Sequence, residues 1–247
     1  MYHAETPVAP RRSDLPGEMA EHLRENIERV QERIAQACRR SGRRREDVKL
    51  VAVSKTHPPE LIRSAYAAGI RDFGENRVQE ARSKRLALAD LNATWHLIGH
   101  LQTNKAKLAA ELFQCVHSVD SLHLAHKLAV AALSARLPVL IEVNLGEEFS
   151  KAGVRAEELT ALAEQIAPIE MLEVRGLMVI PPFCANPEEG RPYFHELRTL
   201  AAEIEARHLP NISMRELSMG MSHDFEVAIE EGATIVRIGT AIFGERA

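Results

Sequence analysis

One lysine and two glycine-containing segments are the residues best suited to chemistry in this chain of 247 residues. Lys55 closes the β-branched run Val48–Lys55, so we expect its amine at the end of a buried strand. The segments Ser218–Ser222 (SMGMS) and Arg237–Thr240 (RIGT) follow two later strand-like runs. Their glycines let backbone N–H groups approach an anion, and serine and threonine add hydroxyl donors. These residue types could hold a phosphate-bearing aldehyde while the lysine forms a Schiff base with it.

Each of these features also has a purely structural explanation. A lysine at a strand end is usually a solvated charge, Ser222 could be a helix N-cap, and Gly239 could serve a turn. Two such loops in succession favour a phosphate site, because barrels of alternating strands and helices bind phosphate after strands seven and eight. Arg237 lies two residues before Gly239, on the same side of its strand, and could donate to a ring nitrogen while Gly239 and Thr240 hold the phosphate.

Alternating strands and helices must position these residues. A first helix is indicated by apolar residues at steps of three and four over 19–38, with Gly42 as its stop. We then expect strands at 48–55, 70–73, 95–98, 115–119, 138–144, 173–180, 216–219 and 234–238. Helices are expected between them at 58–68, 77–89, 105–112, 121–135, 156–167, 193–206 and 224–231. This order predicts an α/β fold, a single (β/α)₈ TIM barrel with an additional N-terminal helix, with an open doubly wound sheet as the alternative.

The same pattern sets the domain organisation. Residues 1–16 are expected to be a disordered lead, and residues 17–247 to form one barrel domain. The long irregular loop from Pro181 to Pro192 is a candidate for a mobile edge of the site.

Composition excludes several classes of function. The net charge of −4, from 31 basic and 35 acidic residues, gives no footprint for nucleic acid or an anionic membrane. The basic run within residues 39–45 is explained by a solvated helix end. Cys38, Cys115 and Cys184 form no Cys-x-x-Cys pair, which argues against disulfides and for a reducing compartment. We see neither a signal peptide nor an apolar span, so we expect a cytoplasmic protein without membrane contact.

The carboxyl ends of barrel strands carry the active face, and the expected ends here are mostly polar or small. They comprise Ser54, Lys55, Gly74, Glu75, Asn76, His96, Gly99, His117, Asn144, Met178, residues 218–222, Arg237, Gly239 and Thr240. The histidines at 96, 100, 117, 123 and 126 raise the question of a metal site. His96 and His100 straddle a strand end rather than sharing one helix face, so we expect no metal.

A family resemblance rests on seven stretches in a fixed order. They are VAVSKTHP (51–58), FGENRVQEA (73–81), WHLIGHLQTNK (95–105), NLGEEFSKAG (144–153), RGLMVIPP (175–182), LSMGMSHDFEVAI (217–229) and VRIGTAIFG (236–244). With them the chain resembles the pyridoxal phosphate homeostasis protein family, whose barrel is similar to the N-terminal domain of alanine racemase. The resemblance implies pyridoxal 5′-phosphate as the cofactor, with Lys55 as the Schiff-base lysine. It also implies cofactor contacts from Asn76, Ser222, Arg237, Gly239 and Thr240, with no catalytic residues.

The resemblance implies a binding protein of intracellular vitamin B6 homeostasis. Such a protein holds pyridoxal phosphate without turnover and delivers it to apo pyridoxal phosphate-dependent enzymes, with amino acids as further partners. We expect a monomer.

The first alternative is an amino-acid racemase, which needs a base on each face of the substrate carbon. In the related racemases a tyrosine from another domain across a dimer supplies one, and this chain ends after the barrel. Tyr2, Tyr66 and Tyr193 are not at strand ends, so none is an evident base. Arg237 cannot accept a proton and would leave the ring nitrogen unprotonated, which disfavours carbanion chemistry. A Schiff-base aldolase for a sugar phosphate is the second alternative, and it would be colourless.

Overall fold

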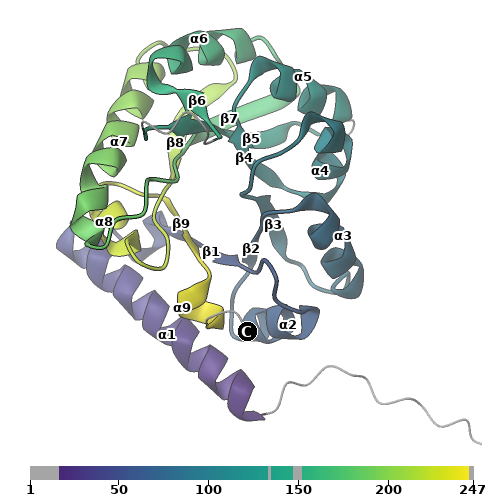
Figure 1. Cartoon of the computed structure of the whole chain (residues 1–247), viewed down its shortest axis with the longest axis vertical. Coiled ribbons are helices and arrows are strands. Elements are labelled where there is room, and N and C mark those ends of the chain that lie inside the picture. The colour runs from purple at the N-terminus through teal and green to yellow at the C-terminus, as the bar shows by residue number, and fades with distance from the viewer. Residues whose placement is uncertain (1–16, 133–134, 147–151, 245–247) are drawn as a thin grey trace, which may run out of the picture.

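Eight parallel strands close into a barrel in the computed structural model, which describes residues 17–132, 135–146 and 152–244 (Figure 1). The strand order is β4–β3–β2–β1–β9–β8–β7–β5, and pairing of β4 with β5 closes the circle. The barrel strands are β1 (Lys49–Val53), β2 (Asp72–Glu75), β3 (Thr94–Leu97), β4 (Cys115–Val119), β5 (Leu137–Asn144), β7 (Leu172–Met178), β8 (Ile212–Ser218) and β9 (Ile235–Ile238). The predicted (β/α)₈ barrel is confirmed, and the open sheet is wrong.

Helices surround the barrel because its strands are apolar on both faces (Figure 1). They are α2 (Pro59–Ala67), α3 (Val78–Ala87), α4 (Ala106–Leu112), α5 (Leu122–Ala131), α6 (Ala156–Ile166), α7 (Arg191–Glu205) and α8 (Phe225–Glu230). The additional helix α1 (Gly17–Arg40) lies across α8 and the short α9 (Thr240–Phe243). Its buried stripe includes Leu23, Ile27 and Ile34, as the apolar spacing predicted.

Alternate residues of each strand point into the barrel or outward to the helices, so the protein has two hydrophobic cores. A small inner cluster fills the barrel and consists of Val51, Cys115, Leu140, Met178 and Ile235. The intervening strand residues, such as Phe73 and Trp95, belong to the larger core between the barrel and its helices. Among the described helices, none is both long enough and apolar enough to cross a bilayer.

Element boundaries depart from the sequence predictions at several places. Strand β2 lies two residues later than the predicted strand 70–73, β7 ends two residues before position 180, and β8 begins four residues before position 216. Strand β1 ends at Val53, two residues earlier than predicted, so Lys55 belongs to the following turn. Several short elements were not predicted. They are helix α9, the two-residue β6 (Val154–Arg155) beside β5, and the 3₁₀ turns 45–47, 103–105 and 187–190. The expected lead 1–16 and residues 147–151 of one family stretch lie outside the described residues.

Candidate functional site

Four neighbouring strands carry every residue predicted to bind the cofactor. In the barrel they follow the order β2–β1–β9–β8, with Val53 paired to Gly74 and Ala52 paired to Ile238. Because the strands are parallel, the segments after them emerge at the same end of the barrel. Asn76, Lys55, residues 239–240 and Ser222 therefore lie in succession along one side of this rim.

The two predicted phosphate loops are bonded to each other. The backbone N–H of Met219 donates to Ile235 O (3.1 Å), and that of Arg237 donates to Gly220 O (3.0 Å). Further out, the N–H of Ala241 donates to Ser222 Oγ at 3.2 Å. Gly220 has φ +90°, and a Cβ there would lie 2.6 Å from the Cβ of Ala228, so only glycine fits. The loops thus form one rigid edge of the rim.

This edge presents donors that the protein leaves available. Within the described chain, the backbone N–H groups of Ser222, Gly239 and Thr240 make no hydrogen bond. The Ser222 hydroxyl accepts from Ala241, so its own O–H can still donate. Three N–H groups and two hydroxyls on adjoining loops are the chemistry that binds a phosphate. The donor set fits the phosphate that the sequence predicted.

Ser222 is not the N-cap of the helix that follows it. Helix α8 begins three residues later, and Asp224 occupies its N-cap position. The Asp224 carboxylate accepts the N–H of Met221 at 2.6 Å. The Ser222 hydroxyl accepts the N–H of Ala241 instead of an N–H group of α8, so the interpretation of Ser222 as an N-cap is wrong.

Lys55 lies in a tight turn at the carboxyl end of β1. The turn closes with a hydrogen bond from His57 N–H to Ser54 O at 3.1 Å, and Lys55 is half-buried within it. Gly239 packs on the same strand end, since a Cβ on it would lie 3.3 Å from Val53 O. On the other side, Asn76 lies against Gly99, where an added Cβ would come within 2.6 Å of Asn76 O.

Arg237 is deeply buried inside the barrel, with 3% of its surface exposed. Its Nη1 donates to Ser218 Oγ (2.6 Å) and its Nη2 to Val179 O (2.9 Å). Burial lowers the pKa of the guanidinium to about 10, while the carboxylates of Glu142 and Asp224 oppose that shift. Arg237 therefore stays charged at neutral pH and is held in one orientation.

A hydrogen-bonded chain continues from Arg237 through two buried histidines. Ser218 Oγ lies 3.0 Å from His117 Nδ1, His117 Nε2 lies 2.9 Å from His96 Nδ1, and His96 Nε2 lies 2.9 Å from Asp72 Oδ1. A guanidinium only donates and a carboxylate only accepts, so with two neutral rings a single arrangement of protons satisfies every link. Ser218 then donates to His117, His117 to His96, and His96 to Asp72. Burial holds the pKa of His117 well below its usual value, in agreement with a neutral ring.

This chain corrects the predicted place of the histidines. His96 and His117 were expected at the rim, but both lie within their strands, fully inside the barrel. With Cys115 they form a group whose potential ligand atoms lie within 4.8 Å of one another. All four ring nitrogens are engaged in the chain, and burial raises the pKa of the Cys115 thiol to about 12. In this arrangement the cluster offers no free ligand to a metal ion.

Sequence reasoning missed Glu142. Its side chain is 5% exposed, and Oε2 has no hydrogen-bond partner among the described residues. Glu142 pairs in register with Met178, and Met178 pairs in turn with Ser218, whose hydroxyl accepts from Arg237. Burial, assisted by the charge of Asp120, raises its pKa to about 7. A single acidic residue in the apolar run PVLIEVN was the available signal.

Comparison with known proteins agrees with this geometry. The family model described as alanine racemase, N-terminal domain, matches residues 20–247. The pyridoxal phosphate homeostasis protein of Aquifex aeolicus (strain VF5) is 50% identical over 224 residues, covering 90% of this chain and 97% of that protein. The chain belongs to the pyridoxal phosphate homeostasis protein family.

Solved structures place this family member among barrels of the same type. PipY of Synechococcus elongatus PCC7942, solved with PLP bound, is similar with a TM-score of 0.80 and 42% identity. That match covers 90% of this chain and all of PipY. Alanine racemase from Corynebacterium glutamicum shares the fold at a TM-score of 0.71 and 18% identity, over 92% of this chain and 62% of the racemase.

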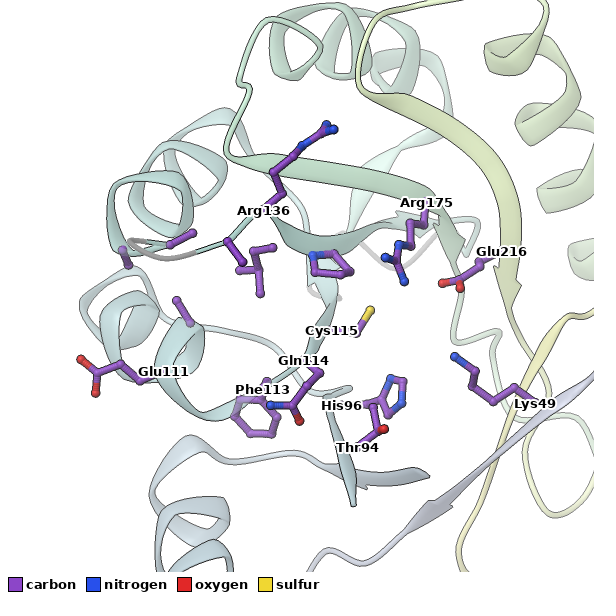
Figure 2. Close-up of a pocket in the computed structure, with 16 residues that line it drawn as sticks. Lys49, Thr94, His96, Glu111, Phe113, Gln114, Cys115, Arg136, Arg175 and Glu216 are labelled. Atoms are coloured by element: carbon purple, nitrogen blue, oxygen red, sulfur yellow. The ribbon is translucent and has the colours of Figure 1, made fainter. Parts of the chain in front are cut away.

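A cavity of about 630 Å³ lies at the opposite, amino end of the barrel in this family member. Its lining includes the first residues of three strands, Lys49, Thr94 and Cys115. Figure 2 shows the side chains of Lys49, Cys115, Arg175 and Glu216 directed toward a common space. None of the residues predicted to bind the cofactor lines this cavity.

Proposed function

We propose that this chain holds pyridoxal 5′-phosphate as a Schiff base on Lys55 and acts in pyridoxal phosphate homeostasis rather than as an enzyme. The names of its relatives and the PLP-bound state of PipY support the cofactor and the role. The observation that carries the assignment is the set of available donors at Ser222, Gly239 and Thr240 beside the turn of Lys55.

Different residues bind different parts of the cofactor. Ser222, Gly239 and Thr240 bind the phosphate through N–H and O–H groups, and Arg237 donates to the ring nitrogen. Asn76, half-buried at the end of β2, contacts the cofactor from the other side of Lys55. When bound, pyridoxal phosphate supplies an aldehyde that an amine can capture and, with a protonated ring, an electron sink.

The residues favour storage over turnover. Arg237 has no acceptor atom and stays charged, so it gives the ring nitrogen a donor but no proton acceptor. Of the tyrosines that the structure describes, Tyr66 lies on α2 under the guanidinium of Arg71, and Tyr193 lies on α7. Both are on outer helices, away from the strand ends, so neither is placed as the second base that racemisation requires.

The proposed role also includes the location of the protein, its oligomeric state and its partners. We expect a cytoplasmic monomer that transfers pyridoxal phosphate to apo pyridoxal phosphate-dependent enzymes and accepts amino acids without converting them. Ile180 and Phe183, which follow β7, are exposed at 43% and 85% and offer apolar contacts to an acceptor.

Two measurements test the proposal. The purified protein should be yellow, and borohydride reduction followed by peptide mapping should attach the cofactor to Lys55. Attachment to another lysine would overturn the site, and a colourless protein that traps a sugar phosphate would favour an aldolase. For turnover, L-alanine in deuterated water should show no α-proton exchange with the loaded protein. Exchange at an enzymatic rate, on the order of 1 s⁻¹, would favour a racemase.

A further inference from the structure

The turn that carries Lys55 has an unusual backbone. Thr56, the next residue, has φ +67°, in the left-handed region. A β-branched residue is disfavoured there, because its branched Cβ crowds the backbone. Such a conformation persists only where the surroundings hold it in place, and it is concentrated at functional sites.

A buried lysine supplies one part of what holds the turn. Lys84 lies on α3 with only 5% of its surface exposed. Its Nζ donates to Ser54 O at 2.7 Å, to Glu75 Oε1 at 2.8 Å and to Glu80 Oε1 at 2.6 Å. An ammonium group has three N–H donors, so all of them are used.

The two carboxylates carry these contacts to both sides of Lys55. Glu75 Oε1 also accepts the Ser54 hydroxyl at 2.6 Å, and Glu80 Oε1 accepts the Thr56 N–H at 2.5 Å. The residue before Lys55 and the residue after it are thus tied to one ammonium. We call this group the Lys84 clamp; its members are Ser54, Thr56, Glu75, Glu80 and Lys84.

Attachment of α3 to the barrel does not explain the clamp. A buried ion pair is often no more stabilising than apolar residues of the same volume, which would join a helix to a sheet equally well. The polar atoms also do not spread along the α3 interface. They converge on the carbonyl and hydroxyl of Ser54 and on the N–H of Thr56, where the strained turn needs to be held.

We propose that Lys84, acting through Glu75 and Glu80, is a positioning residue that fixes the turn around Lys55 for capture of the cofactor aldehyde. This inference rests on the proposed function of Lys55. A fixed turn lowers the entropy cost of bringing amine and aldehyde together. Loss of the clamp should therefore weaken Schiff-base formation more than it weakens noncovalent binding.

Two probes separate these effects in the full-length apo-protein. Pyridoxal 5′-phosphate can form the Schiff base, whereas pyridoxine 5′-phosphate carries an alcohol in place of the aldehyde and can only bind noncovalently. For Lys84→Met we expect at least a tenfold lower equilibrium constant for Schiff-base formation, measured from the visible band and from borohydride trapping. The affinity for pyridoxine 5′-phosphate should stay within twofold of wild type.

Matched variants exclude a general effect on folding. Arg63→Met removes the pair between α2 and Asp90 in the segment after α3, and both probes should bind as in wild type. Adding Thr56→Gly to Lys84→Met should recover at least threefold of the lost Schiff-base formation, because glycine adopts positive φ without strain. Circular dichroism monitors the fold. If Lys84→Met does not fold, Glu80→Gln, at a half-buried position, is tested with the same two probes.

The outcomes are distinct. Equal weakening of both probes would mean that Lys84 acts only on structure, and unchanged capture of the aldehyde would mean that it does nothing for Lys55; either overturns the positioning role. A wild-type protein that forms no Schiff base on Lys55 would instead refute the proposed function itself.

Discussion

The two ends of the barrel differ in what makes them recognisable. The amino end has a cavity of about 630 Å³ lined by charged side chains, among them Lys49, Arg175 and Glu216. At the carboxyl end the notable features belong to the backbone: Gly220 at φ +90°, Thr56 at φ +67°, and N–H groups without acceptors in the described chain. A charged side chain at a rim can be substituted with little effect on the fold, whereas fixed donors and a strained turn require support from surrounding residues. Backbone geometry and cavity size therefore point to opposite ends of the barrel, and the proposed site lies at the end with the distinctive backbone.

The two ends are joined through the barrel interior. The chain from Asp72 to Arg237 begins at the first residue of β2 and passes through His96, His117 and Ser218 to β9. The two histidines link a carboxylate to a guanidinium. The amino end thus contributes to the orientation of Arg237 although it lines no part of the proposed cofactor site.

The largest difference between the two ends should appear when one lysine at each end is replaced by alanine. Lys55→Ala should abolish the visible band, because it removes the amine proposed to form the Schiff base, while the half-buried turn keeps the protein folded. Lys49→Ala, at the amino end, should leave the band unchanged. Absorption spectra of both variants, with circular dichroism as a control of folding, test this contrast. Loss of the band in Lys49→Ala would assign the cofactor to the wrong end.

Glu142 should make the stability of the apo-protein depend on pH. Its pKa rises from 4.5 to about 7 in the folded state, so the folded protein binds this proton more tightly than the unfolded chain does. Its contribution is complete below pH 4.5 and is lost as pH rises through 7. By pH 8 the loss is on the order of 3 kcal/mol.

The glutamine of the Glu142→Gln variant cannot ionise, so this variant should not lose that stability as the pH rises. The free energy of unfolding of the apo-protein is measured with urea at pH 5 and pH 8, with Glu216→Gln at the amino end as the matched control. We expect wild type and Glu216→Gln to lose stability between the two pH values and Glu142→Gln to lose clearly less. Parallel behaviour of all three proteins would show that Glu142 is not the titrating group.

Hydroxyl deletions at the rim should have an intermediate effect. Ser222→Ala and Thr240→Ala each remove one charge-assisted hydrogen bond to the phosphate, typically worth about 1.5–3 kcal/mol, which lowers cofactor affinity about tenfold to a hundredfold. Thr94→Ala removes a hydroxyl at the amino-end cavity and should leave affinity unchanged. Dissociation constants for pyridoxine 5′-phosphate measure all three. If neither rim variant weakens binding, the phosphate lies elsewhere.

Sequence alone predicted the barrel because hydrophobic periodicity is a local property. Each strand and helix of the barrel has its own pattern, and the glycine and lysine positions followed from their places after the strands. Residues whose role depends on distant partners were not predictable in this way. The spacing of Glu80 and Lys84, four apart on a helix, indicates an exposed ion pair. Only the fold brings Ser54 and Glu75 to that lysine and buries it.

The same limit applies to the caps and to the barrel interior. Ser222 and Asp224 are both good N-cap residues by type, but α8 begins after Asp224, and the Asp224 carboxylate accepts the N–H of Met221 before the helix. His96 and His117 were identified as polar residues near strand ends, but their contact depends on the pairing of β3 with β4. A strand boundary misplaced by one or two residues moves a side chain between the rim and the interior.

The smallest effect should come from the cysteine at the amino end. Cys115 is buried, and its thiol pKa of about 12 leaves only a very small thiolate fraction at pH 8. Maleimide should therefore modify the half-buried Cys184 in the native protein, while Cys38 and Cys115 react only after unfolding. Because Cys115 packs in the inner barrel cluster and lines the amino-end cavity, Cys115→Ala should keep the cofactor dissociation constant within twofold of wild type even if it lowers thermal stability. Rapid labelling of native Cys115 would show that the amino-end cavity opens to solvent more than this packing allows. A large loss of cofactor affinity in Cys115→Ala would show instead that the amino end controls the rim through the adjacent histidine pair, and the division between the two ends would have to be abandoned.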